Sequence, residues 1–167
     1  LWGPDGAGGA FSRSKIFINM SSVSPRHTRE LAQELEPTGV TFIDAPVSGT
    51  KKPAEDGALI ILAGGPRDQV QEMEPVLLAM GKKVIYCGPA GQGSMMKMCI
   101  NLLVGLMMEG FAEVLNLAKL GGLPLEAVLD TVYSGALNCG MFQMKAANLQ
   151  NNTYPPAFPP KHMTNDA

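Results

Sequence analysis

Lys97 and Asn101 lie four residues apart in the segment GQGSMMKMCIN (91–101) and could act on one ligand. Residues four apart share one face of a helix. A lysine among methionines is expected to be partly removed from water, which lowers its pKa and suits it to proton transfer. A plainer interpretation also fits, in which Lys97 extends its ammonium group to solvent and Asn101 makes a packing hydrogen bond.

A second polar group, Ser48-Gly49-Thr50, interrupts two apolar runs in the segment DAPVSGTKKPAEDGALIILAGG (44–65). A turn that contains glycine can point successive backbone N–H groups at an anion, and the two hydroxyls add further donors. This pattern suits a substrate carboxylate. The alternative is a solvated polar turn at the end of a strand.

Strands alternate with helices through the first half of the chain, which indicates an α/β fold. Apolar and β-branched runs predict strands at 15–20, 40–46, 58–65 and 82–88. Helices are predicted at 25–35, where Ser24 is the expected N-cap and Pro25 the first residue, and at 66–80. Ser22 follows the first strand, at the sheet edge where open α/β sheets bind ligands, although serines before a helix are also typical of capping.

A long helix is predicted from about residue 92 to 120, because this stretch has no proline and no turn cluster. Its side chains are apolar nearly all round, so we expect it to be buried on several sides, between two bodies. Glu109 and Glu113 interrupt the apolar stretch, which argues against a membrane span. Two shorter amphipathic helices are predicted at 124–135 and 138–150, before a proline-rich end.

The composition narrows the class of protein. Of the 167 residues 46% are hydrophobic and 17% charged, and the net charge is −2, so a folded domain without a nucleic-acid footprint is expected. Three cysteines without metal-ligand spacing indicate free thiols in a reducing compartment, and a count of only two histidines argues against a histidine-based metal site. The first residues do not resemble a signal peptide, so a cytoplasmic protein that binds neither nucleic acid nor membrane is expected.

Three segments together resemble the β-hydroxyacid dehydrogenases, and among them the glyoxylate and succinic semialdehyde reductases. They are FIDAPVSGTKKPAEDGALIILAGG (42–65), GQGSMMKMCIN (91–101) and YPPAFPPKHMTNDA (154–167). The resemblance begins near Ile16 and runs to the last residue. It implies a Rossmann domain that binds NADPH, then a long helix, and then an all-helical domain through which the subunits form an oligomer.

The same resemblance implies roles for individual residues. Lys97 is the catalytic general acid, and Asn101 orients the lysine and the substrate. The substrate carboxylate is held by Ser48, Gly49 and Thr50. The implied cofactor-binding residues are Ser22, which takes the place of a threonine beside the nicotinamide, and two helical-domain residues that close over the site, Phe158 and Asp166.

The chain departs from the family pattern in two places and lacks one of its motifs. Asn165 replaces a lysine near the cofactor, and Pro160 replaces an apolar residue at or near the start of a helix. No GxGxxG turn opens a strand–helix unit anywhere in the sequence, so we expect an interior portion of the enzyme. The expected parts are a partial NADP-binding domain at 1–90, an interdomain helix at 91–121 and the opening of an all-α domain at 122–167.

The sequence therefore predicts an α/β fold, the second half of a Rossmann-type domain, and NADPH-dependent reduction of small aldehyde acids. Two alternatives stay open. One is a 3-hydroxyisobutyrate or sugar-acid dehydrogenase of the same family, against which the loop SGTKKPAEDG argues. The other is a non-catalytic member that acts as an interaction module; that branch lacks the lysine, so Lys97 argues against it.

Overall fold

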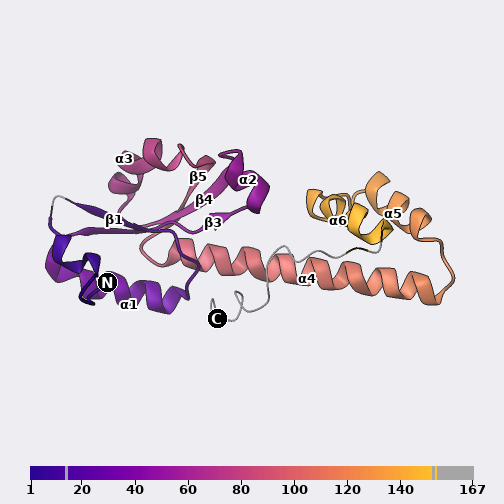
Figure 1. The fold of residues 1–167 in the computed structure, drawn as a ribbon, viewed down its shortest axis with the longest axis horizontal. Coiled ribbons are helices and arrows are strands. Elements are labelled where there is room, and N and C mark those ends of the chain that lie inside the picture. Colours follow the sequence, from indigo (N-terminus) through magenta and orange to yellow (C-terminus); the bar gives the residue numbers. More distant parts are fainter. Residues whose placement is uncertain (14, 152, 154–167) are drawn as a thin grey trace. The chain divides into compact units, whose positions relative to one another are not determined.

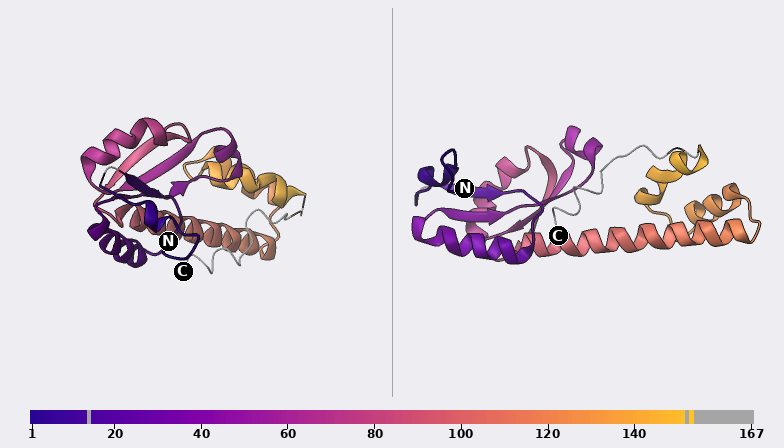
Figure 2. Two further views of the ribbon diagram at one scale, coloured as in Figure 1. Left: turned by 60° about the vertical axis from the view of Figure 1, so that its left-hand side comes forward. Right: turned by 60° about the horizontal axis from the view of Figure 1, so that its bottom comes forward.

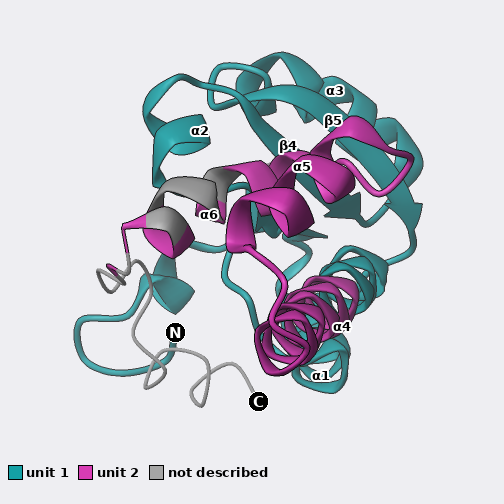
Figure 3. Cartoon of the chain, turned by 90° about the vertical axis from the view of Figure 1, so that its right-hand side faces the viewer, with its two compact units in different colours: residues 1–100, 163–167 teal, residues 101–162 magenta. Residues whose placement is uncertain are grey.

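The computed structural model describes residues 1–13, 15–151 and 153 (Figure 1). The chain divides into two compact units, one made of residues 1–100 and one that begins at residue 101 (Figure 3). The first unit contains the sheet and the helices that cover it. The second contains helices only in its described part.

The first unit is a mixed five-stranded sheet. Its strands are β1 (Ile16–Asn19), β2 (Thr41–Asp44), β3 (Val47–Ser48), β4 (Leu59–Gly64) and β5 (Gly81–Gly88). The pairs β1–β2 and β4–β5 are parallel, whereas β2 and β3 both run antiparallel to β4. The sequence analysis predicted one strand at 40–46; the structure has β2 there, ending at Asp44, and the two-residue strand β3 follows beyond the predicted strand. Pro46 lies between them, and a proline has no N–H to give to a sheet, although its carbonyl accepts from Leu62 N at 2.9 Å.

Two helices, α1 (Pro25–Leu35) and α3 (Arg67–Leu77), cover opposite faces of the sheet (Figures 1 and 2). Neighbouring strand residues point to opposite faces, so each face has its own core. The core beneath α3 consists of Ile43, Ala45, Ile61, Ala63, Val70 and Leu77. The core beneath α1 consists of Leu35, Val40 and Phe42. Because Asp44 is two residues after Phe42, it faces the α1 side.

The helix ends follow from local chemistry. Ser24 caps α1, since its hydroxyl accepts a hydrogen bond from His27 N at 3.2 Å, and Pro25 is the first helical residue as predicted. The helix α3, predicted at 66–80, was expected to reach residue 80 but ends at Leu77. There Met80 N donates to Leu77 O at 3.0 Å, three residues back, and this tighter turn closes the helix.

The second unit packs three helices around a small aromatic core. They are α4 (Gln92–Leu120), which begins in the first unit, α5 (Leu125–Ser134) and α6 (Gly140–Gln150). Phe111 of α4 stacks on Phe142 of α6 with ring centroids 4.3 Å apart, and Leu129 of α5 is buried beside them. The predicted bounds of α4 are confirmed, and Gly122, with φ of 73°, ends it in the left-handed conformation.

Most of α4 is not covered by the described part of the chain. Its leucines include Leu102, Leu106, Leu117 and Leu120, which are between 58% and 79% exposed. The predicted burial on several sides is therefore not provided by the described residues. By length and composition α4 could also cross a membrane, since its mean hydropathy reaches 1.6, but the core helix of a soluble protein has the same pattern.

Candidate functional site

The Ser48-Gly49-Thr50 turn lies at the end of β3, directly before α2 (Lys51–Glu55). Ser48 is half-buried and pairs with Ile60 of β4, while Gly49 and Thr50 are exposed. Gly49 has φ of 148°, and a Cβ there would lie 2.7 Å from Leu59 Cδ2. Only glycine fits this close turn without strain, so the backbone is held against the sheet while its polar groups stay accessible.

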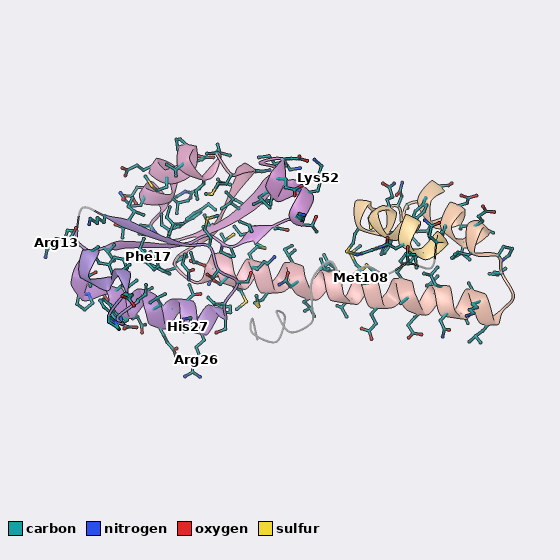
Figure 4. All side chains as sticks on the ribbon, in the orientation of Figure 1. Arg13, Phe17, Arg26, His27, Lys52 and Met108 are labelled. Carbon is teal, nitrogen blue, oxygen red and sulfur yellow. The ribbon has the colours of Figure 1, made fainter. Side chains whose placement is uncertain are left out.

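The helix α2 was not predicted, because the sequence analysis treated residues 51–57 as part of a polar loop. Two adjacent ion pairs, each between residues one turn apart, span it: Lys51 Nζ to Glu55 Oε1 at 3.6 Å and Lys52 Nζ to Asp56 Oδ1 at 2.5 Å. The lysine side chains are 91% and 75% exposed, and Lys52 lies on the outer side of α2 (Figure 4). These charges support a short solvated helix, which accounts for them without a role in binding.

Asp44, at the end of β2, is the most deeply buried charged residue among those that the structure describes, at 1% exposure. Its Oδ1 accepts from Gly91 N at 2.7 Å, and its Oδ2 accepts from Ser94 N at 2.7 Å and Ser94 Oγ at 3.1 Å. Gly91 immediately precedes α4, and Ser94 lies in the first turn of that helix. The carboxylate therefore caps α4 from a strand 47 residues earlier in the chain.

Thr28 of α1 extends this arrangement to a third element. Its Oγ1 lies 2.9 Å from Ser94 Oγ, and both residues are at most 1% exposed. We call Asp44, Ser94 and Thr28 the Asp44 cluster. The sequence analysis did not single out any of its three members, although an acid directly after an apolar strand, as in FID (42–44), was a signal that could have found it.

Cys87, on β5, has an environment that disfavours the thiolate. Burial, and to a smaller extent the negative charge of Asp44, raise the pKa of this thiol above its ordinary value. Its Sγ donates to Ile85 O at 3.4 Å. A protonated, half-buried thiol is a poor nucleophile, so we assign Cys87 no chemistry.

Lys97 and Asn101 occupy successive turns of α4, as predicted, and both are half-buried. Lys97 comes three residues after Ser94, a rise of about 4.5 Å along the helix. The neighbouring Met95 and Met96 are 41% and 38% exposed, so these two methionines are themselves partly open to solvent. The Asp44 cluster therefore fixes the helical turn directly before Lys97.

Ser22 follows β1 at the same end of the sheet as the Asp44 cluster, because Asn19 of β1 pairs with Asp44 of β2. It is half-buried. Ser48 comes four residues beyond Asp44 along the β2–β3 run, or about 13 Å in extended chain. That Lys97 and Ser48 meet one substrate stays a prediction. Two further candidates, Phe158 and Asp166, lie outside the described residues.

The residues of this chain fit one part of a nicotinamide dinucleotide. The carboxyl end of the parallel pair β1–β2 is the usual ligand edge of an α/β sheet, and the half-buried Ser22 hydroxyl stands there. A dinucleotide also needs backbone donors for its pyrophosphate, which a glycine-rich turn and a helix N-terminus supply in Rossmann proteins. The sequence has no such GxGxxG turn, so the residues present fit the nicotinamide end alone.

Two family models together match nearly the whole chain. Residues 2–88 match the NAD-binding domain of 6-phosphogluconate dehydrogenase, and residues 91–167 match the NAD-binding domain of NADP-dependent 3-hydroxyisobutyrate dehydrogenase. The fold and these matches define an α/β protein of the Rossmann type whose sequence matches NAD-binding domains, which confirms the predicted fold class.

Known proteins give the same result. The chain is 37% identical over 98% of its length to glyoxylate/succinic semialdehyde reductase 2, chloroplastic, of Arabidopsis thaliana. It is 40% identical over 91% of its length to glyoxylate/succinic semialdehyde reductase 1 of the same plant. These matches cover 46% and 53% of the relatives, so the chain spans about half the length of the curated relatives it matches.

Among solved structures, the 3-hydroxyisobutyrate dehydrogenase of Mycobacterium tuberculosis, in a structure that includes L-serine, superposes with a TM-score of 0.75. It is 30% identical, and the match covers 84% of this chain and 51% of that one. The chain belongs to the β-hydroxyacid dehydrogenase family. Within that family it stands close to the glyoxylate/succinic semialdehyde reductases.

Proposed function

We propose that this chain serves in an NADPH-dependent reductase that converts small aldehyde acids, glyoxylate and succinic semialdehyde, to hydroxy acids. The observation that carries the proposal is the match of nearly the whole chain to two reductases named for these substrates. Lys97 supports it, because a half-buried lysine in the second turn of a firmly held helix is available for proton transfer.

Each candidate residue has a role in this reaction. When bound, the cofactor supplies the hydride that adds to the aldehyde carbon. Lys97 donates a proton to the carbonyl oxygen, where negative charge develops, and later regains one from solvent. Asn101, one turn further along α4, orients the lysine and the substrate, and the turn formed by Ser48, Gly49 and Thr50 binds the substrate carboxylate.

The cofactor preference for NADPH is part of the proposal. It is supported by the description of the second family model, which names an NADP-dependent enzyme. Ser22 would contact the nicotinamide end of the cofactor, and Phe158 and Asp166 would close over it. Comparing kcat/KM for NADPH and NADH, in the same buffer and with saturating aldehyde acid, tests this preference directly.

A second candidate function is dehydrogenation of 3-hydroxyisobutyrate, which the similarity to the M. tuberculosis enzyme favours. One assay separates the two. The protein translated from its complete reading frame is given NADPH with glyoxylate or succinic semialdehyde, and NADP⁺ with 3-hydroxyisobutyrate. We expect higher kcat/KM with both aldehyde acids. A preference for 3-hydroxyisobutyrate would reject the proposed substrate class.

We further propose that the protein is a homo-oligomer and that a second copy covers the exposed leucines of α4. A buried leucine contributes about 1.5–3 kcal/mol, so a row of them gives a stable interface. Replacing Leu106 and Leu117 by glutamate should reduce the mass measured by light scattering to that of one chain. An unchanged mass would exclude this face as the interface, and flotation of the parent with lipid vesicles would reveal a membrane role instead.

The expected domain bounds of 1–90, 91–121 and 122–167 are proposed in the same way, as is a cytoplasmic location without nucleic-acid partners. One of the Arabidopsis relatives is chloroplastic by its name, so the compartment needs its own measurement. Imaging of the protein tagged after its last residue would decide it. Signal confined to an organelle would contradict the cytoplasmic assignment.

A further inference from the structure

The start of α4 is fixed by side chains that belong to other elements of the sheet unit. Gly91, directly before the helix, has no side chain that could cap it. The Asp44 carboxylate takes that role from β2, with three donors from Gly91 and Ser94 between 2.7 and 3.1 Å. Both residues that carry side chains in these contacts are about 1% exposed.

The backbone approaches closely around the same carboxylate. A Cβ on Gly93, in the first turn of α4, would lie 2.2 Å from Leu62 O and 2.9 Å from Asp44 Oδ2. A Cβ on Gly64 of β4 would lie 2.5 Å from Asp44 Oδ1. The helix is therefore seated on the ends of β2 and β4 without the thickness of a side chain between them. A contact of this kind leaves the first turn little room to shift.

Thr28 of α1 contacts the first turn of α4 as well, through the hydroxyl of Ser94. Since a carboxylate only accepts hydrogen bonds, Ser94 Oγ donates to Asp44, and the Thr28 hydroxyl can then donate to Ser94 Oγ at 2.9 Å. The same hydroxyl lies 3.2 Å from the carbonyl oxygen of Ser24, the N-cap of α1, to which it can donate its single hydrogen instead. The first turn of α4 is thus held from β2 and α1 together, one turn before Lys97.

We infer that Asp44, Ser94 and Thr28 are positioning residues, which set the location of the Lys97 ammonium group without touching the substrate. This inference rests on the proposed function, in which Lys97 is the proton donor. Proton transfer demands hydrogen-bond distances, and a displacement of about 1 Å at the donor can lower a rate roughly a hundredfold. An aspartate is needed here because both of its oxygens accept hydrogen bonds. An asparagine would place its N–H₂ group, which cannot accept, against one set of these donors.

The test compares three variants of the protein translated from its complete reading frame. Asp44→Asn and Thr28→Val weaken the Asp44 cluster, whereas Val70→Ala weakens the core on the opposite face of the sheet and serves as the matched control. We expect Asp44→Asn to lower kcat roughly tenfold to a hundredfold with unchanged KM for NADPH, and Thr28→Val to lower it less. Val70→Ala should lower the melting temperature and leave kcat within twofold of the parent.

A second readout does not depend on the reaction. In reductively methylated protein the ¹³C signal of Lys97, assigned by its loss in Lys97→Met, should shift in Asp44→Asn and stay in place in Val70→Ala. If the parent reduces no aldehyde acid, the proposed function fails while this signal still reports the positioning. An unshifted Lys97 signal, or an active Asp44→Asn enzyme with kcat within twofold of the parent, would overturn the inference.

Discussion

Two polar regions only a few residues apart in DAPVSGTKKPAED (44–56) have opposite environments in the folded chain. Asp44 is buried and accepts three hydrogen bonds from the start of α4. Lys51 and Lys52 are largely exposed and pair with acids one turn along their own short helix. The first region joins segments distant in sequence, whereas the second stabilises only itself.

This difference shows that burial, and not residue type, decides how much a charged group contributes to the stability of the fold. A buried acceptor that loses its donors incurs a desolvation cost of about 1–3 kcal/mol, more for a charged group. An exposed ion pair is screened by water and contributes about 0–1 kcal/mol. We therefore expect substitutions around the start of α4 to have large effects and substitutions on α2 to have small ones.

Lys97→Met should have the largest effect on catalysis. The change keeps much of the side-chain volume and removes the proton donor, so we expect kcat to fall by roughly 10²–10⁴. Affinity for NADPH should change little. Steady-state reduction of glyoxylate and a cofactor titration measure both, and Lys119→Met, in the last turn of the same helix, is the matched control. A kcat within threefold of the parent value would show that Lys97 is not the proton donor.

Gly93→Ala should have the next largest effect, on stability. The added Cβ would overlap the Leu62 carbonyl, and we expect a loss of about 1–3 kcal/mol in the free energy of unfolding. Gly105→Ala on the same helix is the control, because its Cβ would meet nothing within 4 Å and alanine favours a helix by about 1 kcal/mol. Urea unfolding of this chain measures both. Equal effects of the two changes would contradict the close seating of α4.

The sequence predicted the regular elements well where local pattern decides them. The bounds of α1 and α4 and the four strand segments follow from capping residues, glycines and apolar runs. The two-residue strand β3 and the helix α2 were missed, because both lie in the stretch that the sequence pattern predicts as a polar loop.

The Asp44 cluster was missed for a different reason. Its members are separated by 16 and 50 residues, and the packing of α1 and of the start of α4 against the end of β2 brings them together. Lys97, Asn101, Ser48 and Ser22 were singled out by residue type and position, but residues of these types have plain structural explanations as well, so the family resemblance was needed to give them roles. Their joint action on one substrate stays a prediction that kinetics must test.

Ser48→Ala should have a moderate effect that is specific to the substrate. A hydrogen bond to a charged group contributes about 1.5–3 kcal/mol, so KM for glyoxylate should rise about tenfold to a hundredfold. We expect kcat and KM for NADPH to stay near the parent values. Initial rates over a range of glyoxylate concentrations measure this. Unchanged kinetics with both glyoxylate and succinic semialdehyde would remove Ser48 from the proposed site.

Lys52→Gln should have the smallest effect, although it removes the shortest ion pair of α2. The lysine side chain is 75% exposed and its partner Asp56 is 47% exposed, so water and salt already screen the pair. We expect the free energy of unfolding to change by no more than about 0.5 kcal/mol. The KM for glyoxylate should stay within twofold of the parent value, because the Lys52 ammonium group binds Asp56 and not a substrate carboxylate. A tenfold rise in KM, with stability unchanged, would mean that Lys52 leaves Asp56 to bind the substrate. The exposed region would then belong to the site, and the contrast with the buried Asp44 cluster would no longer separate binding residues from solvated ones.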